Sequence, residues 1–117
     1  SVPAGAALRV ELKLRRPAHA NFNGDRPALD HVDLIIGQAG PGKPPRMEVK
    51  RLDARQWQRD GQWVAMQWNL PPMPEGGFVR VRGSNTPEIT PSADPDGEDP
   101  WKDLWFYSNP VFVQIER

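Results

Sequence analysis

The sequence predicts an all-β protein, specifically an immunoglobulin-like antiparallel β-sandwich of about seven strands. Several segments alternate apolar and polar residues with period two, the pattern of a half-buried strand. Turn residues separate these segments at intervals of roughly 10–20 residues, and no segment has a convincing helical period. Fourteen prolines and ten glycines suit short strands joined by turns.

The first predicted strand covers residues 8–15 and alternates without a fault. Its apolar residues should face the core and its charged residues should face water. The apolar set is Leu8, Val10, Leu12 and Leu14, and the charged set is Arg9, Glu11, Lys13 and Arg15.

Three further strands are expected at residues 32–36, 47–52 and 63–70. Residues 53–60, between the last two, could form a turn of helix with Asp53 as its N-cap. The strand at 63–70 places Trp68 on its inward face, and the prolines after it end the strand because proline donates no hydrogen bond to a ladder.

The last third of the chain predicts a strand at 78–82, a long loop at 83–100 and a closing hairpin. The hairpin would pair residues 104–107 with residues 111–115 through Ser108, Asn109 and Pro110, since the residue before a proline is extended. A loop as long as 83–100 is either functional or poorly ordered.

Size and charge exclude several classes of protein. The 117 residues suit one domain spanning residues 1–117, and the absence of an initiator Met suggests a fragment of a longer chain. Fifteen basic and fifteen acidic residues cancel, so we expect no nucleic-acid partner. No apolar run approaches the ~20 residues of a membrane span. Because the sequence contains no cysteine, it does not identify the cellular compartment, and we favour the periplasm or the cell exterior as the location of the protein.

One acidic loop has the composition of a calcium site. Alternating carboxylates around a glycine can wrap oxygen ligands around a hard cation. The same residues also suit a solvated turn, which is the simpler interpretation. The candidate ligands are Asp94, Asp96, Glu98 and Asp99.

No catalytic constellation is visible in the sequence. The two histidines, His19 and His31, are too few for a transition-metal centre with about three protein ligands. At most, His31 and one neighbouring carboxylate share a strand face, and we interpret both histidines as surface or edge residues. We therefore expect this chain alone not to be an enzyme.

Four of the five tryptophans could form an exposed aromatic platform. Such a platform would stack on a sugar or cover a neighbouring domain, and exposed aromatic clusters mark interaction surfaces in general. The fifth, Trp68, is expected in the core. The four are Trp57, Trp63, Trp101 and Trp105.

Two segments carry a family resemblance. Residues 77–83 (GFVRVRG) and 103–113 (DLWFYSNPVFV) resemble the C-terminal tail of bacterial phosphoesterases of the PHP (polymerase and histidinol phosphatase) type. In those proteins a domain behind a metal-dependent catalytic barrel contains an x-R-V-R strand, a variable loop and a Ser-Asn-Pro turn. The family's metal ligands belong to the barrel, and nothing in this sequence matches them.

The resemblance implies a non-catalytic accessory domain at the C-terminus of an exported bacterial enzyme. Its partner would be the catalytic domain of the same parent chain, contacted through the loop at 83–100 and the exposed aromatic residues. The alternative is a carbohydrate- or surface-binding module, which calcium in the acidic loop would stabilise.

Overall fold

The computed structural model describes residues 1–20, 24–26, 28–93, 96–97 and 103–116, and within them the regular structure is entirely β. No described helix could cross a membrane. The strands are β1 (Val2–Pro3), β2 (Leu8–Arg15), β3 (His31–Gln38), β4 (Arg46–Asp53), β5 (Gln58–Asp60), β6 (Trp63–Leu70), β7 (Gly77–Ser84), β8 (Trp105–Tyr107), β9 (Val111–Val113) and β10 (Ile115–Glu116).

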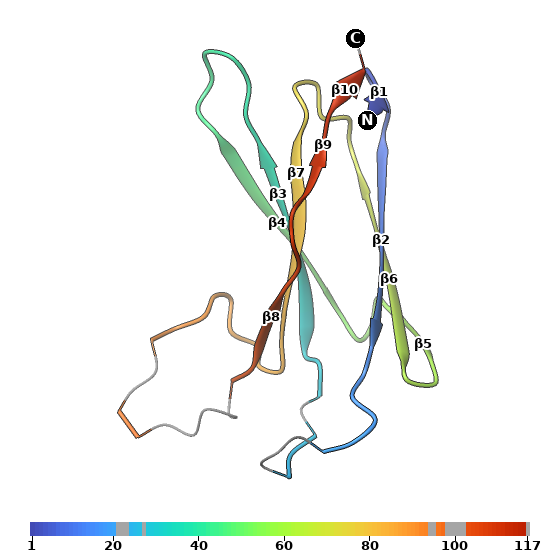
Figure 1. The fold of residues 1–117 in the computed structure, drawn as a ribbon, viewed down its shortest axis with the longest axis vertical. Helices are drawn as coiled ribbons and strands as arrows, with labels where there is room; N and C mark the ends of the chain where they lie inside the picture. Colours follow the sequence, from blue (N-terminus) through green and yellow to red (C-terminus); the bar gives the residue numbers. More distant parts are fainter. Residues whose placement is uncertain (21–23, 27, 94–95, 98–102, 117) are drawn as a thin grey trace.

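Two antiparallel sheets face each other and form a β-sandwich, as the sequence predicts (Figure 1). The smaller sheet has the order β2-β6-β5. The larger sheet has the order β4-β3-β7, and both β8 and β9 pair with the far edge of β7. At the end of the sandwich where both termini lie, β1 runs parallel to β10.

The core lies between the two sheets. Strand β6 contributes Val64, Met66, Trp68 and Leu70, all almost completely buried. They pack with the inward side chains of β3 and β7 in one cluster. The Trp68 indole also donates a hydrogen bond to the Lys50 carbonyl oxygen at 3.2 Å, so the prediction that Trp68 is a core residue is confirmed.

Strand β2 matches its sequence pattern residue by residue. Its apolar side chains are half-buried against the core and its charged side chains are exposed. All eight residues pair with β6, from Leu8 opposite Leu70 to Arg15 opposite Trp63.

The predicted hairpin at the end of the chain is wrong. Strands β8 and β9 lie one after the other along β7, and neither pairs with the other. The Ser108 hydroxyl accepts a hydrogen bond from the Val81 N–H at 2.9 Å, and the Ser108 N–H donates to the Val81 carbonyl at 2.9 Å. Ser108 thus holds the chain against β7, and the extended residue before Pro110 lets the chain run straight on.

The predicted turn of helix at residues 53–60 is also wrong. Asp53 accepts hydrogen bonds from the Arg55 backbone and side chain, and the Gln56 N–H donates to the Asp53 carbonyl, which makes a tight turn. The short strand β5 follows at once and pairs with β6. Asp53 therefore caps a turn between strands and not a helix. The chain after this turn pairs with β6 and forms an edge of the smaller sheet.

Candidate functional site

The acidic loop falls largely outside the described residues. Asp94, Glu98, Asp99 and Trp101 are not described, and Asp96 lies exposed in a turn. Among the residues that the structure places, no three histidine, aspartate or glutamate side chains gather as a metal site.

The three described tryptophans of the predicted platform lie in different environments. Trp57 is only 7% exposed and belongs to the core cluster, so its ring is not on the surface. Trp63 is 49% exposed on the outside of the smaller sheet. Trp105 lies on the larger sheet, where its ring contacts His31 and Arg82. The structure therefore does not bring Trp57, Trp63 and Trp105 together.

The outer face of the larger sheet, which points away from the smaller sheet, gathers the side chains with the most distinctive chemistry. Residues directly opposite each other in antiparallel strands share a face. The sheet register therefore places four rows of side chains across this face, and the rows are Met47–Gly37–Phe78–Phe112, Val49–Ile35–Arg80, Arg51–Asp33–Arg82–Tyr107 and Asp53–His31–Ser84–Trp105.

One half of this face holds a buried charge cluster formed by Asp33, Arg51 and Arg82, and His31 lies beside it. The Asp33 carboxylate is fully buried and accepts hydrogen bonds from Arg51 at 2.8 and 3.1 Å and from Arg82 at 3.1 Å. Two guanidinium groups from the flanking strands thus satisfy one carboxylate on the central strand. A buried charge is tolerated only with such partners.

Electrostatics keep Asp33 ionised. Burial by itself would raise the pKa of Asp33, but the hydrogen bonds from Arg51 and Arg82, together with the positive charge of Arg51, outweigh it and hold the pKa below its usual value. The same hydrogen bond raises the pKa of Arg51. The ion pair therefore persists at neutral pH.

The interpretation of His31 as a surface or edge residue is wrong. Its side chain is 1% exposed, with Nδ1 2.9 Å from Asp30 Oδ2 and Nε2 3.7 Å from Asp33 Oδ2. The Trp105 ring packs edge-on to the imidazole at 6.0 Å between centroids. Local alternation correctly puts His31 and Asp33 on one face, but it does not show that Trp105 and the two arginines cover that face.

The cluster also fastens the start of the long loop to the sheet. Arg51 donates to the carbonyl oxygens of Pro87 and Glu88 at 3.3 and 3.1 Å, and Arg82 donates to the Ile89 carbonyl at 3.1 Å. The arginines therefore satisfy both Asp33 and three backbone carbonyls. This arrangement is a structural clamp for residues 87–89.

The other half of the outer face is an exposed apolar patch. The Phe78 ring lies over Gly37, where a Cβ would approach the ring to 2.1 Å, and meets Phe112 edge-on at 6.5 Å between centroids. Arg80 stacks on the ring of Tyr107 at 5.2 Å. The patch comprises Met47 (62% exposed), Val49 (50%), Phe78, Tyr107 (47%) and Phe112 (71%).

The sequence holds a partial signal for both halves. Arg51, Asp33 and Arg82 each sit at a polar position of an alternating strand, which is equally the pattern of a solvated face. The apolar residues Met47 and Val49 occupy the same alternate positions of β4 as Arg51, and this mixture of apolar and charged residues on one face marks the strand as unusual.

Comparison with known proteins identifies no family for this chain. No protein-family model matches the sequence, and neither a curated protein nor a solved structure matches it.

Proposed function

We propose that this β-sandwich is a non-catalytic interaction domain whose contact surface is the exposed apolar patch. The observation that carries the proposal is the gathering of Met47, Val49, Tyr107 and Phe112 on one face of one sheet, each about half exposed or more. Contiguous exposed apolar surface of this kind marks sites of protein contact. The aromatic rings and the neighbouring Arg80 suit the composition of interface centres.

The proposed partner is the catalytic domain of the same parent chain, in an exported bacterial enzyme of the PHP phosphoesterase type. The resemblance on which this partner depends lies in β7 and in the β8–β9 segment. These strands supply Phe78, Tyr107 and Phe112 to the patch. The segments that carry the family likeness therefore supply three of the five residues of the patch.

We also propose that the sandwich is immunoglobulin-like. That fold places strands B, E and D together in one sheet and strands C, F and G in the other. Here β2, β6 and β5 take the first three places, β3 and β7 take C and F, and the β8–β9 segment takes G. Strand β4 takes the place of the C′ strand that variable-type domains add beside C.

Native mass spectrometry of the protein purified from its source tests the accessory-domain proposal. We expect a chain several times longer than the described domain, carrying bound transition-metal ions in its catalytic part. A mature chain of about this length without metal would contradict the proposal.

A second candidate function, glycan binding, is favoured by the surroundings of Trp63. Its half-exposed ring lines a shallow depression of about 470 Å³ together with Lys13, Gln58, Arg59 and Asp60. A flat ring bordered by polar side chains suits a sugar. Tryptophan fluorescence titrated with a panel of polysaccharides, with Trp63→Ala as control, tests it: no spectral change with any glycan removes this candidate.

A further inference from the structure

The outer edge of β2 differs from every other sheet edge in the described parts of the chain. Edge strands expose unpaired N–H and C=O groups and invite further pairing, so proteins protect them with short strands, charged side chains, prolines or inward-pointing charges. Strand β5 has only three residues, and Pro110 interrupts the β8–β9 edge. Strand β4 has Glu48 and Lys50 on its core-facing side, joined in an ion pair at 3.4 Å.

Strand β2 carries charged side chains on its exposed face but has none of the other protections. It is eight residues long, contains neither proline nor glycine, and carries only apolar side chains on its inward face. The Arg16 N–H donates to the Gln62 carbonyl opposite it, so the even-numbered residues of β2 bond to β6. Alternate residues of an antiparallel strand point the other way. The N–H and C=O groups of Arg9, Glu11, Lys13 and Arg15 therefore face the open edge.

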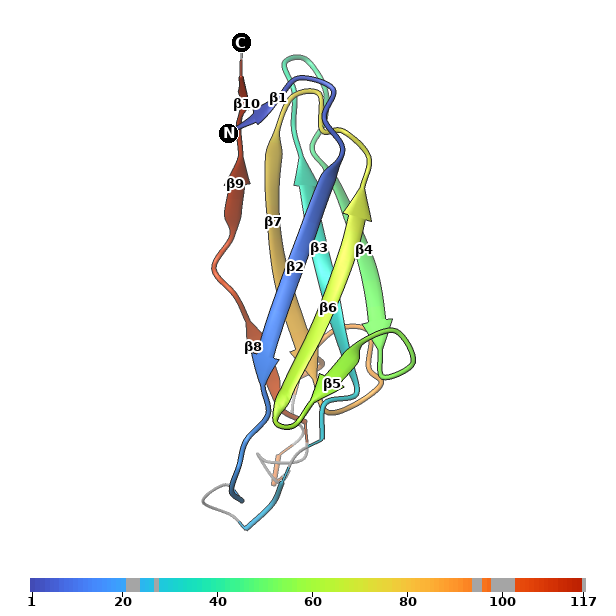
Figure 2. The ribbon, with the colours of Figure 1, turned by 90° about the vertical axis from the view of Figure 1, so that its right-hand side faces the viewer.

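The larger sheet extends beyond β2 and lacks a facing strand there. Figure 2 shows β9 beyond the edge of β2, with no described strand of the smaller sheet in front of it. Val111 shares the core-facing side of the larger sheet with Val79, yet it is 64% exposed. Val113, Phe106 and the inward residues of β2 are only partly buried. The core-facing side of β9 and the inward face of β2 are thus incompletely covered along this edge. We call this strip the slot, and it lies where an immunoglobulin-like sheet has its strand A beside strand B.

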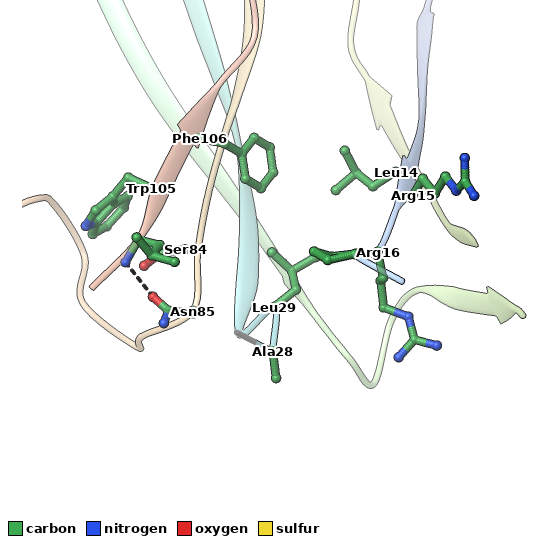
Figure 3. A pocket seen from close by; sticks show the side chains of 11 residues that line it. Leu14, Arg15, Arg16, Ala28, Leu29, Ser84, Asn85, Trp105 and Phe106 are labelled. Carbon is green, nitrogen blue, oxygen red and sulfur yellow. Dashed lines mark hydrogen bonds between the residues drawn. The ribbon is translucent and has the colours of Figure 1, made fainter. Parts of the chain in front are cut away.

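An apolar pocket of about 330 Å³ lies at one end of this slot. Leu14 of β2, Phe106 of β8 and Leu29 surround its opening (Figure 3). A bulky apolar side chain opposite Leu14 would enter it.

The charges along β2 indicate which kind of added strand would pair with its free edge. The exposed face of the strand carries three basic residues and one acidic residue, and Glu11 already contacts Arg9. The residues opposite them on β6 are Asn69, Gln67, Ala65 and Trp63, which neutralise none of these charges. Opposite charges on directly facing residues stabilise strand pairing. A matching strand therefore carries carboxylates opposite Arg9, Lys13 and Arg15.

We propose that the free edge of β2 binds an extended segment of another protein, with apolar residues alternating with acidic ones, as an added antiparallel strand. The new strand bonds to the outward backbone groups of β2, covers Val111 and Phe106 with its apolar side, and pairs its carboxylates with Lys13 and Arg15. Main-chain bonds supply affinity and the alternate side chains supply specificity, as in other cases of strand addition.

A second copy of this chain does not fit the slot. Antiparallel pairing of β2 with its own copy needs a two-fold axis perpendicular to the sheet, so both larger sheets would lie on the same side. Each larger sheet already reaches past its own β2 (Figure 2). The β9 end of each copy would then meet the β8 end of the other copy beside the paired β2 strands, whereas a single extended segment meets no such obstacle.

The test is an NMR titration of the 117-residue chain with a capped peptide of sequence Glu-Leu-Glu-Val-Lys-Val-Glu. In the antiparallel register its glutamates face Arg15, Lys13 and Arg9, and its leucine faces Leu14. We expect the largest amide shifts at the odd-numbered residues of β2 and at Val111, with slowed hydrogen exchange at Lys13. No shift up to millimolar peptide, or shifts confined to other strands, would overturn the proposal.

Charge-reversed variants sharpen the test. The double change Lys13→Glu with Arg15→Glu replaces two attractive pairs by repulsive ones, so binding should weaken about tenfold or more. The peptide Lys-Leu-Lys-Val-Lys-Val-Glu reverses only the charges opposite residues 13 and 15, and it should then bind the variant better than the original peptide does. Arg59→Glu, a reversal on the opposite edge of the same sheet, should leave binding unchanged. Equal binding of both peptides to both proteins would refute the charge selection.

Two neighbouring residues separate this proposal from the proposed function. Val111 faces the slot and Phe112 faces the apolar patch, although both are exposed on β9. Val111→Ser should weaken the peptide and leave docking through the patch intact, and Phe112→Ser should do the reverse. Analytical ultracentrifugation adds one more outcome: dimers with protected Lys13 amides in the absence of peptide would contradict the proposed occupant in favour of a second copy.

Discussion

The two halves of the outer face of the larger sheet differ in what covers them. In the charge cluster, Asp33 is completely buried, and the arginines bonded to it also bond residues 87–89 and contact the Trp105 ring. In the apolar patch, Phe112 lies two rows away on the same face and is 71% exposed. Polar side chains are thus buried and apolar side chains are exposed, the inverse of the usual arrangement. This inversion supports the proposal that the patch binds a partner, whereas the cluster is bonded within the fold.

The largest expected effect is the loss of the central carboxylate. Asp33→Ala leaves Arg51 and Arg82 without their shared partner, and breaking a buried ion pair from one side costs about 3–5 kcal/mol of unfolding free energy. Urea denaturation followed by tryptophan fluorescence measures it. The exposed Asp96→Ala is the matched control and should change stability by less than about 0.5 kcal/mol. A similar small loss for both variants would mean that the cluster contributes nothing to the fold.

A smaller loss should follow when one of the two arginines is removed. Arg82→Met leaves Asp33 bonded to Arg51 alone and deprives the Ile89 carbonyl of its donor, which should cost about 1–3 kcal/mol. Hydrogen exchange at the amides of residues 88–90 should accelerate as well, because the clamp on the loop is weakened. Unchanged exchange there would show that the arginine does not hold the loop.

The prediction of β2 and β6 from sequence succeeded because alternation is a local property. Strand β6 (Trp63–Leu70) has the predicted bounds. Strand β2 (Leu8–Arg15) also has the predicted bounds, and the predicted apolar face is the one that packs on the core. Strand type and facing follow from the period of two, whatever the strand later pairs with.

Prediction from the sequence failed where strand pairing or burial depends on residues that are distant in the chain. The residue types at Ser108 and Pro110 suit a hairpin turn, yet the segments on either side of them, β8 and β9, both pair with the same edge of β7. His31 looks like a surface residue until Trp105, more than seventy positions later, packs against it. Trp57 looks like a loop residue but fills the core. In each case the deciding neighbour is distant in sequence, so no local pattern carries the information.

The pH dependence of stability offers a subtler way to isolate the cluster. The folded-state pKa of Asp33 is lowered, so its contribution is complete above the unfolded pKa of about 3.9 and is lost as pH falls through the folded value. The stability difference between the natural chain and Asp33→Asn should therefore shrink below about pH 4. Asp53, whose pKa the Arg55 side chain lowers to about 2, titrates equally in both proteins. A constant difference across this range would contradict the ion pair.

The smallest effect on stability is expected in the apolar patch. Phe112→Ser changes an exposed side chain and should alter unfolding free energy by no more than about 0.5 kcal/mol. If the proposed partner, a catalytic domain of the same parent chain, is correct, the same change should abolish measurable association with that domain in isothermal titration calorimetry. A substantial loss of stability with association intact would reverse the assignment of the two halves.

Hydroxyl-radical footprinting of the isolated chain and of the natural full-length protein tests the central claim most directly, because it reports the exposure of individual side chains. Met47, Tyr107 and Phe112 should be modified rapidly in the isolated chain and slowly in the natural protein. Trp63, on the other sheet, should react equally in both. Unchanged rates at the patch, or protection of Trp63 alone, would contradict the assignment of the apolar patch as the contact surface.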